Sequence, residues 1–227
     1  MIWEMLTCIE QLEFAGEIYG LSRRQANEKG IQLLHDLGLY EKKNKSARTL
    51  SGGMQRRLNL ALALVHDPPI LILDEPQAGL DPQSRIMVRE YLRSLSHRTT
   101  IILTTHDMDE VERLADRVAI IDQGRLLVMD TPDRLKNSLG SGKILEIRVN
   151  EDESGKSEQL LAALPSGVEQ KTFRQGVIRI VCSGIDEVLN DIFQVLKTGG
   201  IEIEDLHIRD KSLEDVFVSL TGRGLRE

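Results

Sequence analysis

The spacing of hydrophobic and capping residues predicts that residues 1–69 are almost entirely helical. Thr7 and Ser22 each begin a capping box, in which a hydroxyl side chain is followed three positions later by Glu or Gln. Leu33, Leu34 and Leu37 then form an apolar stripe with helical spacing. The predicted helices cover about 8–19, 23–37 and 54–65.

The pattern changes after Pro69. Ile70–Leu73 is apolar on both faces, which is expected of a strand buried inside a parallel sheet. Asp81 before Pro82 predicts a helix with an N-cap and a proline in its first turn. Further strands are expected at 100–105, 118–121 and 125–129, the last returning through a hairpin turn, and helices at 108–115 and 132–138. This alternation predicts an α/β fold with a parallel sheet.

Gly140-Ser141-Gly142 predicts a linker, and a second domain is expected beyond it. Strands are expected at 144–149, 168–174, 177–182 and 201–208, and helices at 157–164, 186–198 and 212–220. A β-α-β-β-α-β order with a trailing helix suggests a small α+β domain of ferredoxin-like fold. The expected domains are therefore 1–139, divided into a helical part (1–68) and a sheet-containing part (69–139), and an accessory domain (143–227).

Composition and charge narrow the class of protein. Of the 227 residues, 41% are hydrophobic and 29% are charged, and the formal net charge of −7 gives no bulk attraction to nucleic acid. We therefore expect no nucleic-acid partner. Cys8 and Cys182 lie in apolar surroundings without metal-binding spacing, which fits a reducing cytosol. No apolar run approaches the roughly 20 residues that span a bilayer, so we expect any role at the cell membrane to be on its cytoplasmic face, through a partner.

Two acidic residues lie at the end of the first predicted strand. Asp74 and Glu75 directly follow Ile70–Leu73, and ligands of open α/β sheets bind at the carboxyl edge of the strands. Asp74 is suited to hold Mg²⁺, and Glu75 is suited to polarise a water that attacks a phosphate. The alternative is an acidic strand end that only caps the following turn.

A glycine pair and a histidine are further candidates. Ser51, Gly52 and Gly53 precede a predicted helix, where a hydroxyl, close backbone approach and helix N–H groups make an anion site. The alternative is a loop in which Ser51 is simply the N-cap. His106 follows the predicted strand at 100–105 and could donate to a terminal phosphate, or it is a hydrogen-bonded structural residue.

Together the segments S-G-G-M-Q-R-R, L-I-L-D-E-P, A-G-L-D-P-Q-S-R and T-T-H-D, in this order and spacing, resemble the ABC ATPase family over about residues 1–138. The resemblance implies an incomplete P-loop NTPase (RecA-like) ABC nucleotide-binding domain with a helical subdomain, and ATP and Mg²⁺ as its ligands. The resemblance implies that Ser51, Gly52, Gly53 and Met54 form the signature loop. It implies that Asp74 is the magnesium (Walker B) residue and that Glu75 and the switch residue His106 are catalytic. Asp81 would contact the nucleotide in the D-loop.

The C-terminal segment 212–222 resembles the extension found on ATPases of ABC-2-type exporters, the drug and polysaccharide efflux group. Met54, in place of the commoner glutamine, fits the same subgroup. The resemblance implies an ATP-binding and ATP-hydrolysing subunit of an export system. Its implied partners are a membrane permease and, in a homo- or heterodimer, another ABC ATPase subunit.

The phosphate loop of the family, G-x-x-x-x-G-K-[ST], is expected ahead of the first helix and is not found. Gly142-Lys143 is rejected because Asn137 and Ile144 stand where the first glycine and the hydroxyl residue should be. We therefore expect Met1 to fall within a domain, as in an N-terminally truncated chain, and the chain alone to bind ATP poorly. The alternative function is a non-catalytic subunit or fragment that donates its signature loop to a complete ATPase partner.

Overall fold

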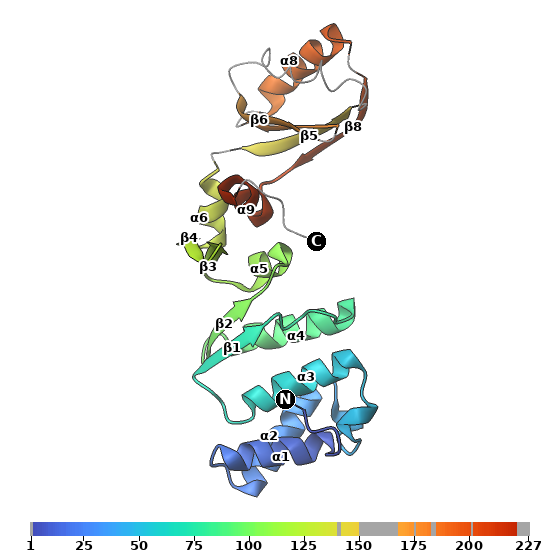
Figure 1. Cartoon of the computed structure of the whole chain (residues 1–227), viewed down its shortest axis with the longest axis vertical. Coiled ribbons are helices and arrows are strands. Elements are labelled where there is room, and N and C mark those ends of the chain that lie inside the picture. The colour runs from blue at the N-terminus through green and yellow to red at the C-terminus, as the bar shows by residue number, and fades with distance from the viewer. Residues whose placement is uncertain are drawn as a thin grey trace. The chain divides into compact units, whose positions relative to one another are not determined.

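The computed structural model describes residues 2–139, 142–149, 168–174, 176–182, 185–200 and 202–221. The chain separates into two compact units, Met1–Asp107 and Met108–Glu227, whose elements are labelled in Figure 1. None of the helices in the described ranges has the length and hydrophobicity that crossing a membrane requires.

Three α-helices begin the first unit: α1 (Cys8–Ile18), α2 (Arg23–Asp36) and α3 (Gly52–Leu64). Both predicted capping boxes are present, because the Thr7 and Ser22 side chains accept from the backbone N–H three positions later. Two short 3-10 helices, η1 (Tyr40–Lys42) and η2 (Ala47–Thr49), lead into α3. The helix predictions are confirmed, although α3 begins two residues earlier than predicted because Ser51 is its N-cap.

The three helices share an apolar core. Leu12, Leu34 and Leu58, one from each helix, are fully buried. Helices α1 and α2 pack closely at Gly16, where a Cβ would lie 2.6 Å from the Cβ of Ala26. This packing gives α3, which carries the glycine pair, a fixed support.

The rest of the first unit is a β-α-β segment. It consists of β1 (Ile70–Asp74), α4 (Pro82–Leu95) and β2 (Thr100–Thr104), and the strands pair in parallel from Ile70 with Thr100 to Asp74 with Thr104. Asp81 is the N-cap of α4, as predicted, and its side chain accepts from the Ser84 N–H at 3.0 Å. The carboxyl ends of β1 and β2 therefore meet at one edge.

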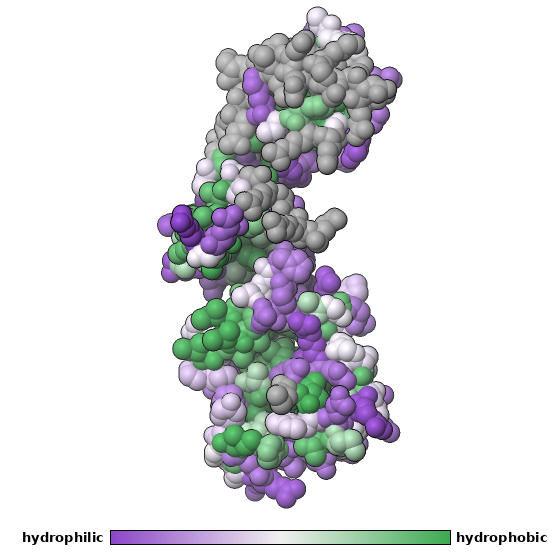
Figure 2. Space-filling model, viewed as in Figure 1, coloured by the Kyte–Doolittle hydropathy of each residue, from purple (hydrophilic) through white to green (hydrophobic). Residues whose placement is uncertain are grey.

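Strand β1 is apolar on both faces, as expected of a strand from inside a parallel sheet, but the described chain covers only one of them. Ile72 is 74% exposed, and Ile70 and Ile102 are also exposed, so an apolar surface lies over β1 and β2 (Figure 2). Among the described residues β1 and β2 pair only with each other, so no further strand covers them. The predicted parallel sheet thus has two strands here.

The second unit begins with α5 (Met108–Leu114), β3 (Val118–Asp122), β4 (Arg125–Asp130) and α6 (Pro132–Asn137). Strand β3 pairs antiparallel with β4, not with the parallel pair, and Gln123 and Gly124 take positive φ values of 49° and 75° in the tight turn between them. The last helix, α9 (Leu213–Thr221), packs onto these elements. Their shared core consists of Val111, Val118, Ile120, Leu135, Leu213 and Val216.

A four-stranded antiparallel sheet completes the second unit. Its strands are β5 (Lys143–Val149), β6 (Val168–Arg174), β7 (Val177–Cys182) and β8 (Ile203–Arg209), in the order β6-β7-β5-β8. Helix α8 (Ile185–Thr198) packs Ile192 and Leu196 against the sheet. The helix predicted at 157–164 and most of the predicted linker lie outside the described residues, so the ferredoxin-like fold stays a prediction.

The division of contacts lies between Asp107 and Met108, whereas the predicted domain limits lie near residue 140. The reason is that α9, from the end of the chain, shares a core with α5 and α6. Glu112 of α5 adds a polar link: its Oε1 accepts from the Leu213 N–H at 2.8 Å, and its Oε2 lies 3.0 Å from Lys136 Nζ.

A cluster of four charged residues joins the sheet to the start of α9. Glu146 of β5 and Asp215 of α9 face Arg179 and Arg209, with 2.8 Å between Arg179 Nη2 and Glu146 Oε1 and 2.7 Å between Arg209 Nη1 and Asp215 Oδ2. Burial opposes ionisation of Asp215, but hydrogen bonds from Arg209 and Ser212 outweigh it and lower the carboxyl pKa to about 2.

We expect Asp215→Asn to lower the free energy of unfolding by about 2 kcal/mol at neutral pH, because two arginines lose a buried anionic partner. The folded-state pKa of Asp215 lies below the ordinary value, so this stabilisation is present above about pH 4 and is lost as the pH falls toward 2. Urea denaturation at several pH values measures it. Glu214→Gln, one position earlier and exposed, is the control, and equal stability of Asp215→Asn and wild type at neutral pH would contradict the expectation.

Candidate functional site

Asp74 is the last residue of β1 and lies opposite Thr104, the last residue of β2. The Thr104 hydroxyl donates to the Asp74 carboxylate. Asp74 is exposed at this strand edge, where a carboxylate can reach a ligand. The structure thus places Asp74 where the sequence predicted it.

Glu75 continues the chain beyond the strand with an uncommon backbone conformation. Its φ is +45°, in the left-handed region, and its N–H donates to the Thr104 carbonyl at 3.0 Å. The carboxylate oxygen Oε1 accepts from the His106 backbone N–H at 3.0 Å and lies 2.7 Å from His106 Nδ1. Glu75 and His106, 31 positions apart, therefore meet directly.

The contact has a consequence for the imidazole. Opposite an ionised Glu75, Nδ1 of His106 must carry a proton, so Nε2 is the ring nitrogen that can face a ligand. The His106 side chain is 76% exposed, whereas that of Glu75 is 30% exposed. The arrangement is a half-buried carboxylate that orients an exposed imidazole, which suits binding of an anion. The catalytic roles of both residues stay predictions.

The glycine loop lies at the amino end of α3. The Ser51 hydroxyl accepts from the Met54 N–H at 3.3 Å, so Ser51 is the N-cap that the alternative interpretation required. Gly52 is exposed, and a Cβ placed on it would have no atom within 4 Å. A Cβ on Gly53 would lie 3.4 Å from Cδ2 of Leu80. The cap uses the Ser51 oxygen and leaves open space over the first turn, where the nucleotide role of Ser51–Met54 stays a prediction.

Asp81 has a structural role in the described chain. Besides its bond from the Ser84 N–H, its Oδ2 accepts from the Ser84 hydroxyl at 2.6 Å. These hydrogen bonds, the one from the hydroxyl first, lower the pKa of the Asp81 carboxyl. The cap keeps Asp81 ionised at the start of α4, and its contact with a nucleotide stays a prediction.

A residue that the sequence interpretation did not single out links the helix of the glycine loop to the acidic pair. The guanidinium of Arg56, on α3, donates to the main-chain carbonyl of Glu75. The signal that could have found it is its position two residues after Met54, one helical turn beyond the glycines.

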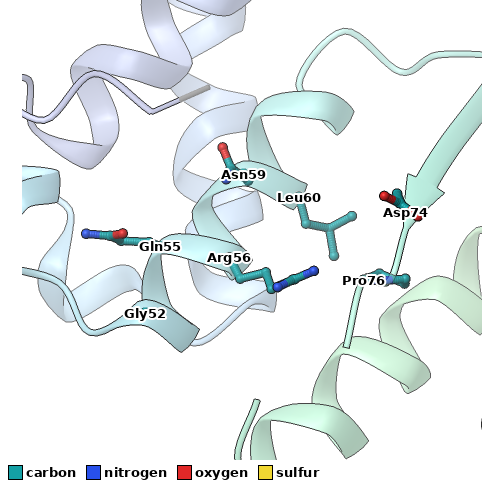
Figure 3. A pocket seen from close by; sticks show the side chains of 7 residues that line it. All are labelled: Gly52, Gln55, Arg56, Asn59, Leu60, Asp74 and Pro76. Carbon is teal, nitrogen blue, oxygen red and sulfur yellow. The ribbon is translucent and has the colours of Figure 1, made fainter. Parts of the chain in front are cut away.

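An open pocket of about 340 Å³ lies between α3 and the end of β1. Figure 3 shows Arg56 extending from α3 towards Pro76 and Asp74 on the facing segment. The pocket is lined by Gly52, Gln55, Arg56, Asn59, Leu60, Asp74 and Pro76. Its lining joins residues of the predicted signature and magnesium motifs in one cavity.

The carboxylate at this strand edge fits a weakly held magnesium ion. Magnesium in nucleotide sites is held by one or two carboxylates together with substrate phosphates, and Asp74 is a suitable single carboxylate. In the part of the chain that the structure describes, no group of three or more His, Cys, Asp or Glu side chains is placed to hold a metal. A second Gly-Lys pair, Gly155-Lys156, is followed by Ser157 but has Asn150 where the first phosphate-loop glycine should be, and it lies outside the described residues.

Comparison with known proteins adds independent findings. Residues 14–112 match the family described as "AAA domain, putative AbiEii toxin, Type IV TA system", and residues 131–221 match "ATP-binding protein DrrA1-3-like, C-terminal domain". The linearmycin resistance ATP-binding protein LnrL of Bacillus subtilis (strain 168) is 36% identical over 231 residues, covering 100% of this chain and 73% of that protein.

Two further similarities agree. The daunorubicin resistance ATP-binding protein DrrA2 of Streptomyces coeruleorubidus is 35% identical over 220 residues, covering 96% of this chain and 68% of that protein. A solved structure titled "Structure of ATP binding subunit of ABC transporter" aligns with a TM-score of 0.56 at 29% identity, covering 62% of this chain and 59% of that one.

We expect Mg²⁺ alone to bind the chain with a dissociation constant no tighter than on the order of 1 mM, because Asp74 lacks the phosphate oxygens that complete a magnesium site. Isothermal titration with MgCl₂ measures this, with Asp74→Asn as the comparison. Micromolar binding that Asp74→Asn abolishes would show that the chain itself completes the magnesium site, contrary to this expectation.

Proposed function

The chain belongs to the ABC-type ATP-binding proteins of the drug-resistance group, and we propose that it is the ATP-binding and ATP-hydrolysing subunit of an ABC-type export system. In that role it couples hydrolysis to transport through a membrane permease, at the cytoplasmic face of the cell membrane. The relatives that support this include a Nod factor export ATP-binding protein of Cupriavidus metallidurans, 38% identical over 220 residues, 96% of this chain and 69% of that protein.

The observation that carries the proposal is the contact of Glu75 with His106 beside Asp74. Glu75 Oε1 accepts hydrogen bonds from His106, so Oε2 is the oxygen that polarises the attacking water. His106 Nε2 then faces the terminal phosphate, held in orientation by the carboxylate behind it. A magnesium ion at Asp74 would supply charge neutralisation for the phosphates.

Ser51, Gly52 and Gly53 are proposed to contact the nucleotide of a second ABC ATPase subunit, in a homo- or heterodimer. The open space over Gly52 and the N–H groups of the first turn of α3 favour a phosphate there. Met54 and Asp81 are proposed to lie at the same nucleotide. The 227 residues contain no G-x-x-x-x-G-K-[ST] sequence, and we propose that the phosphate loop facing this signature belongs to the second subunit.

We further propose that residues 1–139 form the ATPase part, divided at 68/69, and that residues 143–227 form an accessory domain with a ferredoxin-like fold. The antiparallel order β6-β7-β5-β8 supports the second point, since a split β-α-β arrangement brings its first and third strands together in the middle of the sheet. Residues 131–221 match a family of C-terminal domains, which supports a separate C-terminal module.

A second function remains in competition: a non-catalytic subunit that donates only its signature loop to a complete ATPase partner. The absence of a phosphate-loop sequence among these residues favours it. The two functions differ in whether Glu75 takes part in hydrolysis.

We expect the chain alone to bind MgATP with a dissociation constant weaker than about 1 mM, because the backbone N–H groups and lysine of a phosphate loop supply most of the affinity. Isothermal titration with MgATP measures it, and micromolar binding would overturn the proposal that phosphate binding lies outside these residues.

In a complex assembled with a complete ABC ATPase subunit and its permease, we expect Glu75→Gln to lower the ATPase rate of the site it serves by about 100-fold. Gly52→Ala is expected to raise KM for ATP while leaving the fold intact, since an added Cβ meets nothing in this chain. Glu90→Gln, an exposed position of α4, is the control. If Gly52→Ala impairs the ATPase activity of the complex and Glu75→Gln does not, the result would favour the signature donor over the catalytic subunit.

A further inference from the structure

The backbone of Glu75 is held in a conformation that its sequence disfavours. A φ of +45° is uncommon for a residue with a side chain, and the residue before a proline, here Pro76, is normally extended. Such a conformation persists only where surrounding contacts hold it.

Three contacts meet the Glu75 peptide groups. Its N–H donates to the Thr104 carbonyl at 3.0 Å, and its carbonyl accepts from the Ala78 N–H at 3.2 Å. The first of these contacts comes from the facing strand β2, and the second closes the turn that follows Glu75. The third comes from another element: the Arg56 guanidinium, carried by α3, donates to the same carbonyl.

We propose that Arg56 is a positioning residue for Glu75, holding the left-handed turn that presents the carboxylate to His106. A guanidinium is always charged and its hydrogen bonds are stronger than neutral ones, so it suits the task of fixing a carbonyl. Arg56 is half-buried and lines the pocket beside Pro76 and Asp74 (Figure 3).

The neighbouring arginine shows that this contact is specific to Arg56. Arg57 is buried, and its Nη1 donates to the Leu37 carbonyl at 2.9 Å and lies near Met87 Sδ. Arg57 thus fixes α3 to the end of α2, while Arg56 fixes α3 to Glu75. Two adjacent residues of the same type on one helix therefore serve different segments.

The consequence for regulation rests on the proposed function. Arg56 stands on the same helix as Ser51 and Gly52, which are proposed to contact a partner subunit's nucleotide. A displacement of α3 when that nucleotide binds would reach the Glu75 peptide through Arg56, and so change the orientation of the carboxylate and His106. The signature helix and the hydrolytic residues of one chain would then respond together.

The test uses the ¹⁵N-labelled full chain without nucleotide. In wild type the His106 amide is bonded to Glu75 Oε1, so its hydrogen exchange reports the carboxylate position. We expect Arg56→Met to speed hydrogen exchange of this amide about tenfold, because the Glu75 carbonyl loses a charged donor. Glu75→Ala, which removes the acceptor of the amide itself, should speed the exchange as well. The long-range ¹H–¹⁵N spectrum of the imidazole should lose its Nδ1–H signature in both variants.

Arg56→Lys keeps a charged donor and is expected to restore part of the protection. Arg57→Met is the matched control: it should loosen the α2–α3 contact and leave the His106 amide and imidazole signals unchanged. Circular dichroism establishes that each variant is folded. Wild-type exchange and an intact Nδ1–H signal in folded Arg56→Met would overturn the positioning role.

If Arg56→Met does not fold, Arg56→Lys serves as the test. A partial loss of exchange protection at the His106 amide supports the inference, and wild-type protection refutes it. No nucleotide enters this experiment. A chain that proves to have no ATPase activity would therefore leave the positioning result standing, and a negative exchange result would leave the proposed ATPase function standing.

Discussion

The site depends on the in-register parallel pairing of β1 with β2. This pairing sets Asp74 opposite Thr104, and the next residue of each strand leaves the sheet at the same edge. Glu75 then takes its left-handed turn, and its carboxylate meets His106, which lies 31 positions away in sequence. A shift of one residue in the register would move Glu75 away from His106 and turn the side chains to the opposite faces.

Helix α3 gives this edge its second support. Its amino end carries the capped glycine loop, and its next turn carries Arg56, which reaches the Glu75 carbonyl. Capping and ligand binding are compatible at such an end, because a helix has four N–H groups without an intrahelical partner and Ser51 satisfies one of them. The structural interpretation of Ser51 is therefore confirmed without excluding a phosphate at the remaining groups.

In the second unit, charge and apolar packing act together at α9. Leu213 and Val216 share a core with α5 and α6, while Asp215 meets arginines from β7 and β8. A buried carboxylate of this kind is tolerated because its partners are guanidinium groups and N–H donors that compensate for its lost hydration. This is why the contacts of the last helix extend over both the hairpin region and the sheet.

By itself the sequence determined the described α-helices and β-strands to within about two residues, apart from the end of α4, which it did not predict. Capping boxes, helix N-caps, β-branched runs and a tight turn act over a few neighbouring positions. The two 3-10 helices η1 and η2 were not predicted. It also singled out the candidate residues Asp74, Glu75 and His106, since each directly follows a predicted strand and belongs to a short sequence motif. The apolar run Ile70–Leu73 predicted a strand, but which of its faces is buried depends on the neighbouring strands and not on the residues of one strand.

Only the tertiary structure decided how distant segments meet. The contact of Glu75 with His106, the reach of Arg56 to the Glu75 carbonyl and the packing of α9 on α5 all join residues that no local pattern relates. The positive φ of Glu75 belongs to the same group, because a conformation that the residue and its following proline disfavour exists only where contacts from other elements outweigh its cost.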